Sequence, residues 1–234
     1  MRRMSAMIGV LGGMGPLATV DFLRKLVERT PAASDQEHVP LVVYSVPQIP
    51  DRVGAILAGG DSPLPAMQAG VRMLERAGAK AIAIACNTAH HWHEELARDC
   101  SVPLLHIADC ACAALGNEVV RVGLLGTAGT LAAGFYQQRL AARGYQCLTS
   151  RQDEIEGWVI PGIALVKAGE VRGGGALLQQ ALAALFERGA QRVILACTET
   201  PLALEAVAAP QLPRCVDATA ALADACIRWS MENA

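Results

Sequence analysis

The chain has 234 residues and a formal net charge of −2, and no stretch of it concentrates lysine and arginine. Binding to nucleic acid needs such a concentration, so we expect no nucleic-acid partner. Hydrophobic residues make up 53% of the chain but aromatic residues only 4%, which favours a core of small aliphatic side chains between helices and parallel strands.

No uninterrupted apolar run approaches the roughly 18 to 20 residues that a membrane-spanning helix needs, so we expect no membrane partner. An apolar stretch follows the arginines near the N-terminus, but three glycines and a proline between Gly12 and Pro16 make it a poor export signal. In a long, core-rich chain without such a signal, the eight cysteines are expected to remain reduced thiols. We therefore expect a cytoplasmic protein.

Strands and helices alternate along the first half of the chain. Short apolar runs predict the strands, and capping residues followed by apolar stripes predict the helices. The expected strands are residues 7–11, 41–45, 82–85 and 104–107, and the expected helices are residues 16–29, a segment from 62, and residues 88–98 and 109–115. This alternation is typical of an open, doubly wound sheet.

The second half of the chain repeats the order of the first. Aligning Ile8 with Val122, an offset of 122 − 8 = 114 residues, matches three glycines of the first strand and turn with three glycines of the second. Helices are expected near residues 131–143 and 173–188, and a strand is expected at residues 192–196. A short strand and a helix should follow between residues 214 and 229.

These matches predict an α/β fold of two similar α/β/α lobes with mainly parallel open sheets, related by a pseudo-twofold internal duplication. We assign residues 1–108 to the first lobe and residues 109–211 to the second. Residues 212–234 are expected to return and pack on the first lobe. Ligands of open α/β sheets bind beyond the carboxyl ends of the strands, so we expect the active site in the cleft between the lobes.

Two cysteines end corresponding strands of the two halves. Cys86 follows the apolar run 82–85 and Cys197 follows the run 193–196, so we expect the two thiols to face each other across one substrate. Each stands where a helix should begin, which lowers the pKa of a thiol by favouring the thiolate. Two such groups on opposite faces of one carbon can remove a proton from one side and return one from the other, which inverts a stereocentre.

The carbanion formed between those two proton transfers needs donors that do not move. Asn87, Thr88 and Thr198, together with backbone N–H groups at the two helix starts, are suitably placed to hold a carboxylate and its developing charge. The other cysteines are expected to be inert and packed in the interior. They are Cys100, Cys110, Cys112, Cys147, Cys215 and Cys226.

Five separated motifs occur in a fixed order over nearly the whole chain, at residues 12–19, 47–52, 86–90, 126–130 and 197–202. Together they resemble the aspartate/glutamate racemase family, whose members interconvert amino-acid enantiomers with two cysteines and no cofactor. The resemblance implies that Cys86 and Cys197 are the two acid/base residues and that the substrate is aspartate, with glutamate as a second candidate. It also implies a homodimer.

The resemblance further implies which residues contact the substrate. It assigns the α-carboxylate to Asn87, Thr88 and Thr198, and it places Arg52 near the side-chain carboxylate, for which a guanidinium fork is well shaped. The full set of expected substrate contacts is Met14, Gln48, Arg52, Asn87, Thr88, Thr127, Thr130, Lys167, Thr198 and Glu199. Cell-wall glutamate racemases are less similar, because they carry a histidine where this chain has Glu199.

For four side chains the sequence allows two different roles. Gln48 and Tyr136 would either contact the substrate or brace a loop, and Glu199 would either assist the second thiol or cap a helix. Asp21 is a further potential auxiliary, although an isolated carboxylate is usually solvated or a cap.

Cofactors and metals are the first competing interpretation. Residues 13–18 fit the dinucleotide pattern G-x-G-x-x-A after a strand, but the second expected strand ends without an acidic residue for a ribose. Cys86, His90 and His93 have a helical spacing that would suit zinc, yet about 10 Å of helix axis separates the first from the last. A Schiff-base lysine for pyridoxal phosphate would have to be Lys25, Lys80 or Lys167. We expect neither a cofactor nor a metal.

Two other functions also compete. The same scaffold resembles maleate isomerases and hydantoin racemases, in which a cysteine attacks or deprotonates other small acids. A non-catalytic carboxylate-binding protein is the other alternative, and it would bind aspartate without exchanging its α-hydrogen.

Overall fold

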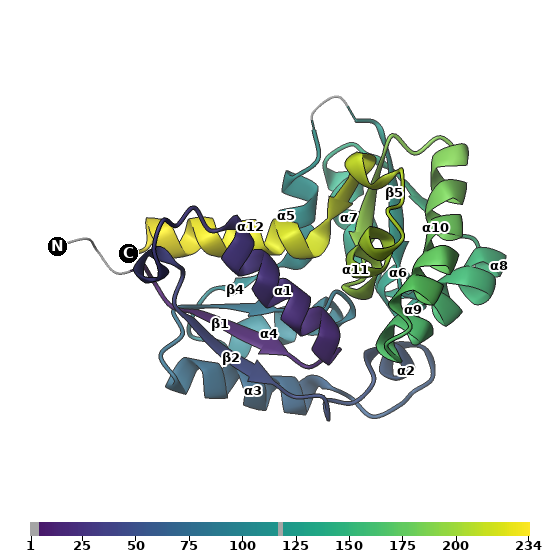
Figure 1. Ribbon diagram of the computed structural model, residues 1–234. Coiled ribbons are helices and arrows are strands. Elements are labelled where there is room, and N and C mark those ends of the chain that lie inside the picture. Colours follow the sequence, from purple (N-terminus) through teal and green to yellow (C-terminus); the bar gives the residue numbers. More distant parts are fainter. Residues whose placement is uncertain (1–4, 117–118) are drawn as a thin grey trace.

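Within residues 5–116 and 119–234, which the computed structural model describes, each half of the chain forms a four-stranded sheet of parallel strands (Figure 1). The first sheet has the order β2-β1-β3-β4, with β1 Ile8–Gly12, β2 Leu41–Ser45, β3 Ala81–Ile84 and β4 Leu104–Leu105. The second has the order β6-β5-β7-β8, with β5 Arg121–Gly126, β6 Gln146–Thr149, β7 Arg192–Ala196 and β8 Cys215–Asp217. The predicted fold of two parallel α/β lobes is confirmed. Residues 1–4, where an export signal would begin, lie outside the described range.

The central strands of both lobes pair in the same register. Ile8 lies opposite Ala81 in the first sheet, and Val122 lies opposite Arg192 in the second. Ile8 and Val122 are also the two residues that the repeat in the sequence aligns. The internal duplication is therefore present in the strand pairing as well as in the sequence.

Close packing requires glycine at equivalent positions of the two central strands. A Cβ atom added to Gly9 would lie 2.9 Å from Cβ of Ala79, and one added to Gly123 would lie 2.8 Å from Cγ2 of Val193. Carbon atoms at these distances overlap, so any larger residue would push the neighbouring segment away. The two lobes share this constraint because they share the same packing.

Helices cover both faces of each sheet. In the first lobe α3 and α4 pack on the outer face, and in the second lobe α9, α10 and α11 do so. The helices of the first half are α1 Pro16–Arg29, α2 Arg52–Leu57, α3 Leu64–Arg76, α4 His93–Asp99 and α5 Ile107–Ala113. Those of the second half are α6 Ala128–Ala133, α7 Phe135–Ala142, α8 Gln152–Glu154, α9 Ile160–Lys167, α10 Val171–Glu187, α11 Glu199–Ala206 and α12 Ala218–Glu232.

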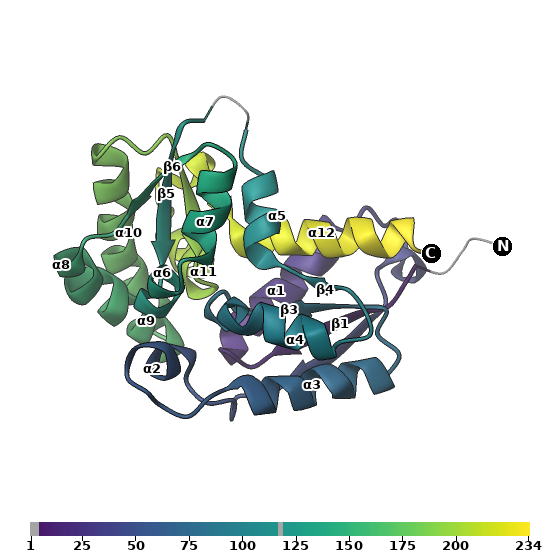
Figure 2. The same cartoon turned by 180° about the vertical axis from the view of Figure 1, so that it is seen from behind.

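The inner faces of the two sheets share one hydrophobic core. This core joins Val10 of β1 to Leu124 of β5 through side chains of α1, α5, α7 and α12. Helix α12 leaves the second sheet and runs along the first lobe, beside α1 and α5 (Figures 1 and 2). Because the core is continuous, each lobe depends on the other for part of its interior.

The C-terminal segment, which we expected to return to the first lobe as a whole, is divided. Strand β8 pairs in parallel with β7 and extends the second sheet, whereas α12 packs against α1, β3 and β4 of the first lobe. The physical reason is that the edge of β7 would otherwise remain unpaired, just as β4 covers the edge of β3 in the first sheet.

Several predicted elements differ in detail from the structure. The helix expected at residues 88–98 starts as a 3₁₀ turn, Thr88–Trp92, before α4 begins. The helix expected at residues 131–143 is interrupted at Gly134, whose φ of 73° is left-handed and ends α6 before α7 starts. Strand β6 and the helical segment from α8 to α9, which includes a π-helical turn at Ile155–Val159, were not predicted.

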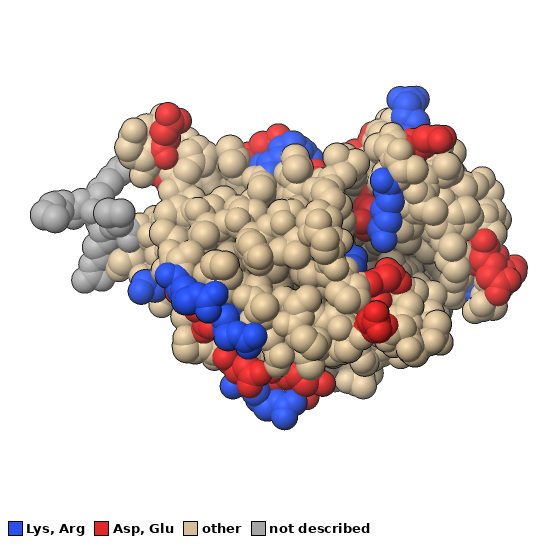
Figure 3. Space-filling view, turned by 90° about the horizontal axis from the view of Figure 1, so that it is seen from below, with Lys and Arg blue, Asp and Glu red and all other residues tan. Residues whose placement is uncertain are grey.

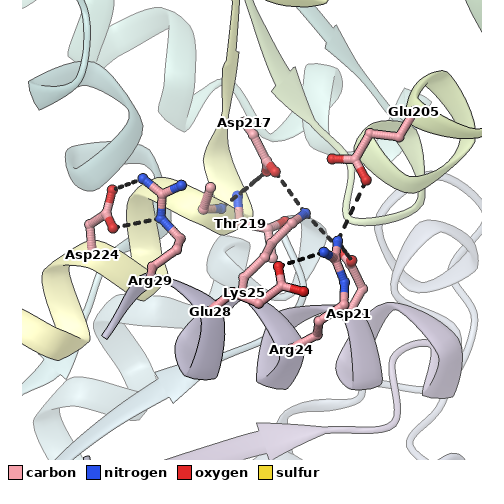
Figure 4. A network of polar contacts seen from close by, with 10 residues as sticks. Asp21, Arg24, Lys25, Glu28, Arg29, Glu205, Asp217, Thr219 and Asp224 are labelled. Atoms are coloured by element: carbon pink, nitrogen blue, oxygen red, sulfur yellow. Dashed lines mark hydrogen bonds and ion pairs between the residues drawn. The ribbon is translucent and has the colours of Figure 1, made fainter. Parts of the chain in front are cut away.

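A polar network ties α1 to elements of the second lobe (Figure 4). Lys25 is only 5% exposed. Its Nζ lies 2.5 Å from Oδ2 of Asp21 and 2.7 Å from Oδ2 of Asp217, which ends β8. Arg24 pairs with Asp21 at 2.6 Å and lies 3.5 Å from Glu205 of α11. Asp21, considered above as a catalytic auxiliary, therefore belongs to a bridge between the lobes.

The molecular surface shows charges of both signs. On the face in Figure 3, lysine and arginine lie among aspartate and glutamate and form no continuous basic area. Among the helices of the described part of the chain, none combines the length and the apolar character that crossing a membrane requires.

Candidate active site

The loops that follow β1, β3, β5 and β7 meet at the carboxyl ends of the two sheets and enclose a small pocket. Its lining residues are Met14, Asp51, Arg52, Val53, Cys86, Asn87, Thr88, Thr127, Lys167, Cys197, Thr198 and Glu199. Cys86 comes from the first lobe and Cys197 from the second. The structure therefore brings both cysteines and eight of the ten expected contact residues to one place.

The two remaining expected residues lie elsewhere. Gln48 is exposed in the turn after β2 and does not line the pocket. Thr130 is fully buried behind the pocket wall, where its Oγ1 lies 2.9 Å from Oγ1 of Thr88. Thr88 also lies 2.9 Å from Thr127, whose hydroxyl accepts a hydrogen bond from the Thr130 backbone N–H and caps α6. This hydroxyl cluster joins the two lobes directly beside Cys86.

The pocket is closed in this conformation. About 20 Å³ of space remains between its side chains, which is enough for a single water molecule. Cys86 is 5% exposed and Cys197 is 2% exposed. An amino acid can enter only if the surrounding loops or the lobes move apart.

Cys86 lies beside a cation. Arg52 starts α2, and its Nη1 donates hydrogen bonds to the carbonyl groups of Ile49 and Pro50, both at 3.0 Å. Its Nε is buried and has no hydrogen-bond partner among the described residues. Burial raises the pKa of the Cys86 thiol, and the positive charge of Arg52 offsets part of that rise.

The backbone at Cys86 is fixed by a histidine. Burial lowers the pKa of His90 to about 4, so its ring is neutral at pH 7. Because the partner of its Nδ1 is the carbonyl oxygen of Cys86, 2.8 Å away, that nitrogen carries the proton and donates it. His90 is therefore a structural support of the first thiol.

Cys197 lies beside an anion. Its Sγ donates a hydrogen bond to Oε2 of Glu199 at 3.1 Å, and the Thr198 hydroxyl donates to the same oxygen at 3.0 Å. Burial raises the pKa of Cys197 well above its usual range, and the negative charge of Glu199 raises it further. Both protons therefore point at one buried carboxylate.

The expectation that helix starts lower both thiol pKa values is wrong. The backbone N–H of Ala89 favours the Cys86 thiolate, but loss of water around the buried sulfur has the larger effect. After Cys197, α11 begins only at Glu199, and burial again dominates. Sequence position shows that a helix follows a thiol, but it does not show how deeply the sulfur is buried.

Two pocket residues were missed by sequence reasoning. Asp51 and Val53 flank Arg52 on the pocket wall. The Asp51 side chain accepts a hydrogen bond from the Gly54 N–H at 2.6 Å and caps α2. An aspartate directly before a helical turn was the available signal, but the prolines at residues 47 and 50 favoured a loop.

The histidines considered for zinc use their rings in other ways. His90 bonds to the Cys86 carbonyl, and Nε2 of His93 lies 3.0 Å from the carbonyl oxygen of Leu104. Within the described ranges, no three His, Cys, Asp or Glu side chains are grouped as metal ligands.

Comparison with known proteins agrees with this geometry. The sequence pattern of the Asp/Glu/Hydantoin racemase family matches residues 11–226. The broad specificity amino-acid racemase RacX of Bacillus subtilis is 30% identical over 93% of this chain and 95% of its own length. A glutamate racemase of Pseudomonas paraeruginosa is 33% identical over 84% of this chain and 70% of its own length.

The structure of the Picrophilus torridus aspartate racemase superposes with a TM-score of 0.85 at 31% identity, covering 96% of this chain and 94% of that one. The glutamate racemase of Francisella tularensis, at 16% identity and a TM-score of 0.73, shares the fold. The motifs, the two-lobed fold and these matches agree, and the chain belongs to the Asp/Glu/hydantoin racemase family as an amino-acid racemase.

Proposed function

We propose that the protein interconverts L- and D-aspartate without a cofactor, with Cys86 and Cys197 as the two proton-transfer groups. The observation that carries this proposal is that thiols from opposite lobes line one buried pocket. A two-base racemase needs one group on each face of the α-carbon. Two lobes related by an internal duplication provide such a pair.

The different neighbours of the thiols suggest a starting protonation state. Cys86, beside Arg52, is the better candidate for the thiolate, and Cys197 holds a proton that it donates to Glu199. The Cys86 thiolate would take the α-proton of one enantiomer, and the Cys197 thiol would protonate the carbanion from the opposite face. The Cys86 thiol and Cys197 thiolate that result are the state needed for the reverse reaction, and Glu199 would help Cys197 to regain its proton.

Burial has two opposite effects on this chemistry. Because both thiol pKa values are raised, less thiolate is present at neutral pH. Any thiolate that does form is correspondingly a stronger base for a weakly acidic α-proton. Asn87, Thr88 and Thr198 line the same pocket and would hold the α-carboxylate of the substrate during both transfers.

The charges of the pocket favour an acidic side chain. The buried Nε of Arg52 has no partner within the part of the chain that is described, and a guanidinium in that state favours a carboxylate. Lys167 borders the pocket and forms no ion pair with any described residue. We favour aspartate over glutamate because the aspartate racemase of Picrophilus torridus covers 96% of this chain with a TM-score of 0.85.

A second candidate is a racemase with a wider range of substrates. A neighbouring hollow of about 150 Å³ shares Lys167 and Glu199 with the reaction pocket. Its other lining residues are Gly15, Pro16, Leu17, Ala18, Val166 and Leu202. This lining would accept an apolar side chain, and the Bacillus subtilis relative carries the name of a broad specificity racemase.

We also propose that the protein is a cytoplasmic homodimer. The eight cysteines are all free thiols, which suits a reducing compartment. Light scattering coupled to size-exclusion chromatography would measure the mass in solution, and a value near 24.6 kDa, the mass of one chain, would contradict the dimer.

The experiment that tests the function is a chiral assay in deuterated water with acidic and neutral amino acids and no added cofactor. We expect D-aspartate to form from L-aspartate with deuterium at the α-carbon. Faster conversion of neutral amino acids than of aspartate would favour the second candidate. Binding of aspartate without α-exchange, or conversion only of maleate or a substituted hydantoin, would refute the proposal.

A further inference from the structure

We infer that Tyr136 is a positioning residue that reaches from the second lobe and fixes the side-chain amide of Asn87 for substrate binding. Tyr136 lies on α7, is fully buried, and does not line the pocket. Its hydroxyl lies 2.6 Å from Oδ1 of Asn87, the residue directly after the first thiol. The inference rests on the proposed racemase function.

The chemistry of the tyrosine hydroxyl determines which way the amide points. Burial raises the pKa of Tyr136 well above its usual value, so the hydroxyl keeps its proton. That proton needs an acceptor, and Oδ1 of Asn87 is the acceptor that the described structure provides. If the amide were reversed, its NH₂ group would meet the hydroxyl oxygen and the tyrosine proton would be left unpaired in the interior.

The nitrogen of the Asn87 amide is the atom that would bind the substrate. Nδ2 of Asn87 is buried and has no hydrogen-bond partner among the described residues. Asn87 itself is 2% exposed and lines the reaction pocket. An unpaired, buried NH₂ group at this place is a donor held ready for a carboxylate oxygen, whereas a reversed amide would present its oxygen and repel the carboxylate.

The bond also links the two lobes. Asn87 follows a strand of the first lobe, whereas Tyr136 belongs to the second. The donor beside Cys86 is therefore oriented by the lobe that carries Cys197. Substrate binding to Asn87 in the first lobe therefore depends on the correct position of Tyr136 in the second lobe.

Tyr136→Phe tests the inference because it removes only the hydroxyl. In racemisation of L-aspartate we expect the KM to rise about tenfold. An Asn87 amide that is no longer fixed loses its hydrogen bond to the substrate carboxylate, and one such bond to a charged group corresponds to about that factor. The kcat should change less than about twofold, because the amide holds ground state and transition state alike. The matched control is Tyr145→Phe, which alters a half-buried tyrosine of the same lobe and should retain the parent KM.

A double-mutant cycle separates positioning from a general structural effect. In an Asn87→Ala background, adding Tyr136→Phe should change the KM for L-aspartate by less than about twofold, because the two residues act through one amide. If the tyrosine substitution has no effect alone, or if the two effects multiply, the inference is overturned.

A measurement on the unaltered protein covers the case in which Tyr136→Phe does not fold. The chain contains three asparagines, so selective ¹⁵N labelling of asparagine gives three side-chain NH₂ signals, of which Asn87→Ala identifies one. Adding L-aspartate should shift the Asn87 signal and leave that of Asn233 in place. An unshifted Asn87 signal in a protein that racemises aspartate would refute the positioning role alone, whereas a protein that neither binds nor racemises aspartate would refute the proposed function.

Discussion

Each lobe places a cysteine just beyond the end of the corresponding strand, β3 or β7, but the groups around the two sulfur atoms differ. The central strands of both sheets pair in one register, and each cysteine follows the corresponding strand. Beside Cys86 lies the guanidinium of Arg52, whereas Cys197 donates a hydrogen bond to Glu199. Duplication explains why there are two thiols, and the later divergence of their neighbours gives each a different tendency to hold its proton.

The loops also exchange contacts between the lobes in a nearly symmetric way. Thr88, two residues after Cys86, touches Thr127 in the loop after β5. Glu199, two residues after Cys197, lies close to Gly15 in the loop after β1, where an added Cβ would be 3.5 Å from its Oε1. A residue close to each thiol, Thr88 or Glu199, therefore contacts a loop of the opposite lobe.

Removing either thiol should have the largest effect on activity. Cys86→Ser and Cys197→Ser should each lower the rate of racemisation by about 10³- to 10⁴-fold, because a serine hydroxyl is a far weaker base than a thiolate. Each variant should still exchange the α-hydrogen of one enantiomer only, as followed by NMR in deuterated water. Cys147→Ser, in β6 and away from the pocket, is the control, and full activity of both single-thiol variants would contradict the two-base mechanism.

Removing the cation beside Cys86 should have the next largest effect. Arg52→Gln deprives the thiolate and the substrate carboxylate of a partner, and we expect kcat/KM for aspartate to fall about 100-fold, or about 2.7 kcal/mol. Steady-state kinetics with aspartate and alanine measure this. Alanine, which lacks the side-chain carboxylate, should lose less. An equal loss for both substrates would mean that Arg52 acts on the thiol alone, and Arg72→Gln on the exposed side of α3 provides the control.

Removing the anion beside Cys197 should make the pKa values of the two thiols more alike. The charge of Glu199 raises the pKa of both thiols, and Cys197 also donates a hydrogen bond to that carboxylate. In Glu199→Gln the Cys197 pKa should fall, so alkylation of Cys197 by iodoacetamide should begin at lower pH, with a smaller change at Cys86. Peptide mass spectrometry across a pH series measures both sites, and racemisation should drop about tenfold as proton return slows. A shift of Cys197 alkylation to higher pH would contradict this account.

The smallest expected effect comes from the hydroxyl cluster between the lobes. Thr130→Val removes the bond behind Thr88 and should lower the free energy of unfolding by about 1 kcal/mol, with a two- to threefold rise in KM. Urea denaturation and kinetics measure these two changes. Thr219→Val is the matched control, because Thr219 is also fully buried but its hydroxyl has no partner in the described structure.

Much of this architecture was predictable because it repeats. Alternating apolar runs and turn glycines indicated parallel lobes, and the aligned positions Ile8 and Val122 take equivalent places in the two sheets. The weaker signals were missed. Strand β6 is short and only half-buried, so its apolar pattern is faint, and the effect of Gly134 on its helix depends on a local left-handed turn.

Only part of the site could be predicted from the sequence. Asn87 and Thr198 lie within the motifs at residues 86–90 and 197–202, so their place in the pocket could be predicted from the sequence. The bond between Tyr136 and Asn87 joins residues that are far apart in the chain, so no local pattern indicates it. The direction of the thiol pKa shifts depends on burial, which only the packed structure reveals.

The buried bridge at Lys25 has a mechanical consequence. Lys25 is held between carboxylates of both lobes, and separating the lobes would take Asp217 away from the buried ammonium group, which is unfavourable. Lys25 lies nine residues along α1 from Pro16, about 14 Å from the pocket end of that helix at 1.5 Å per residue. The bridge therefore opposes any opening of the pocket that would move α1 away from β8.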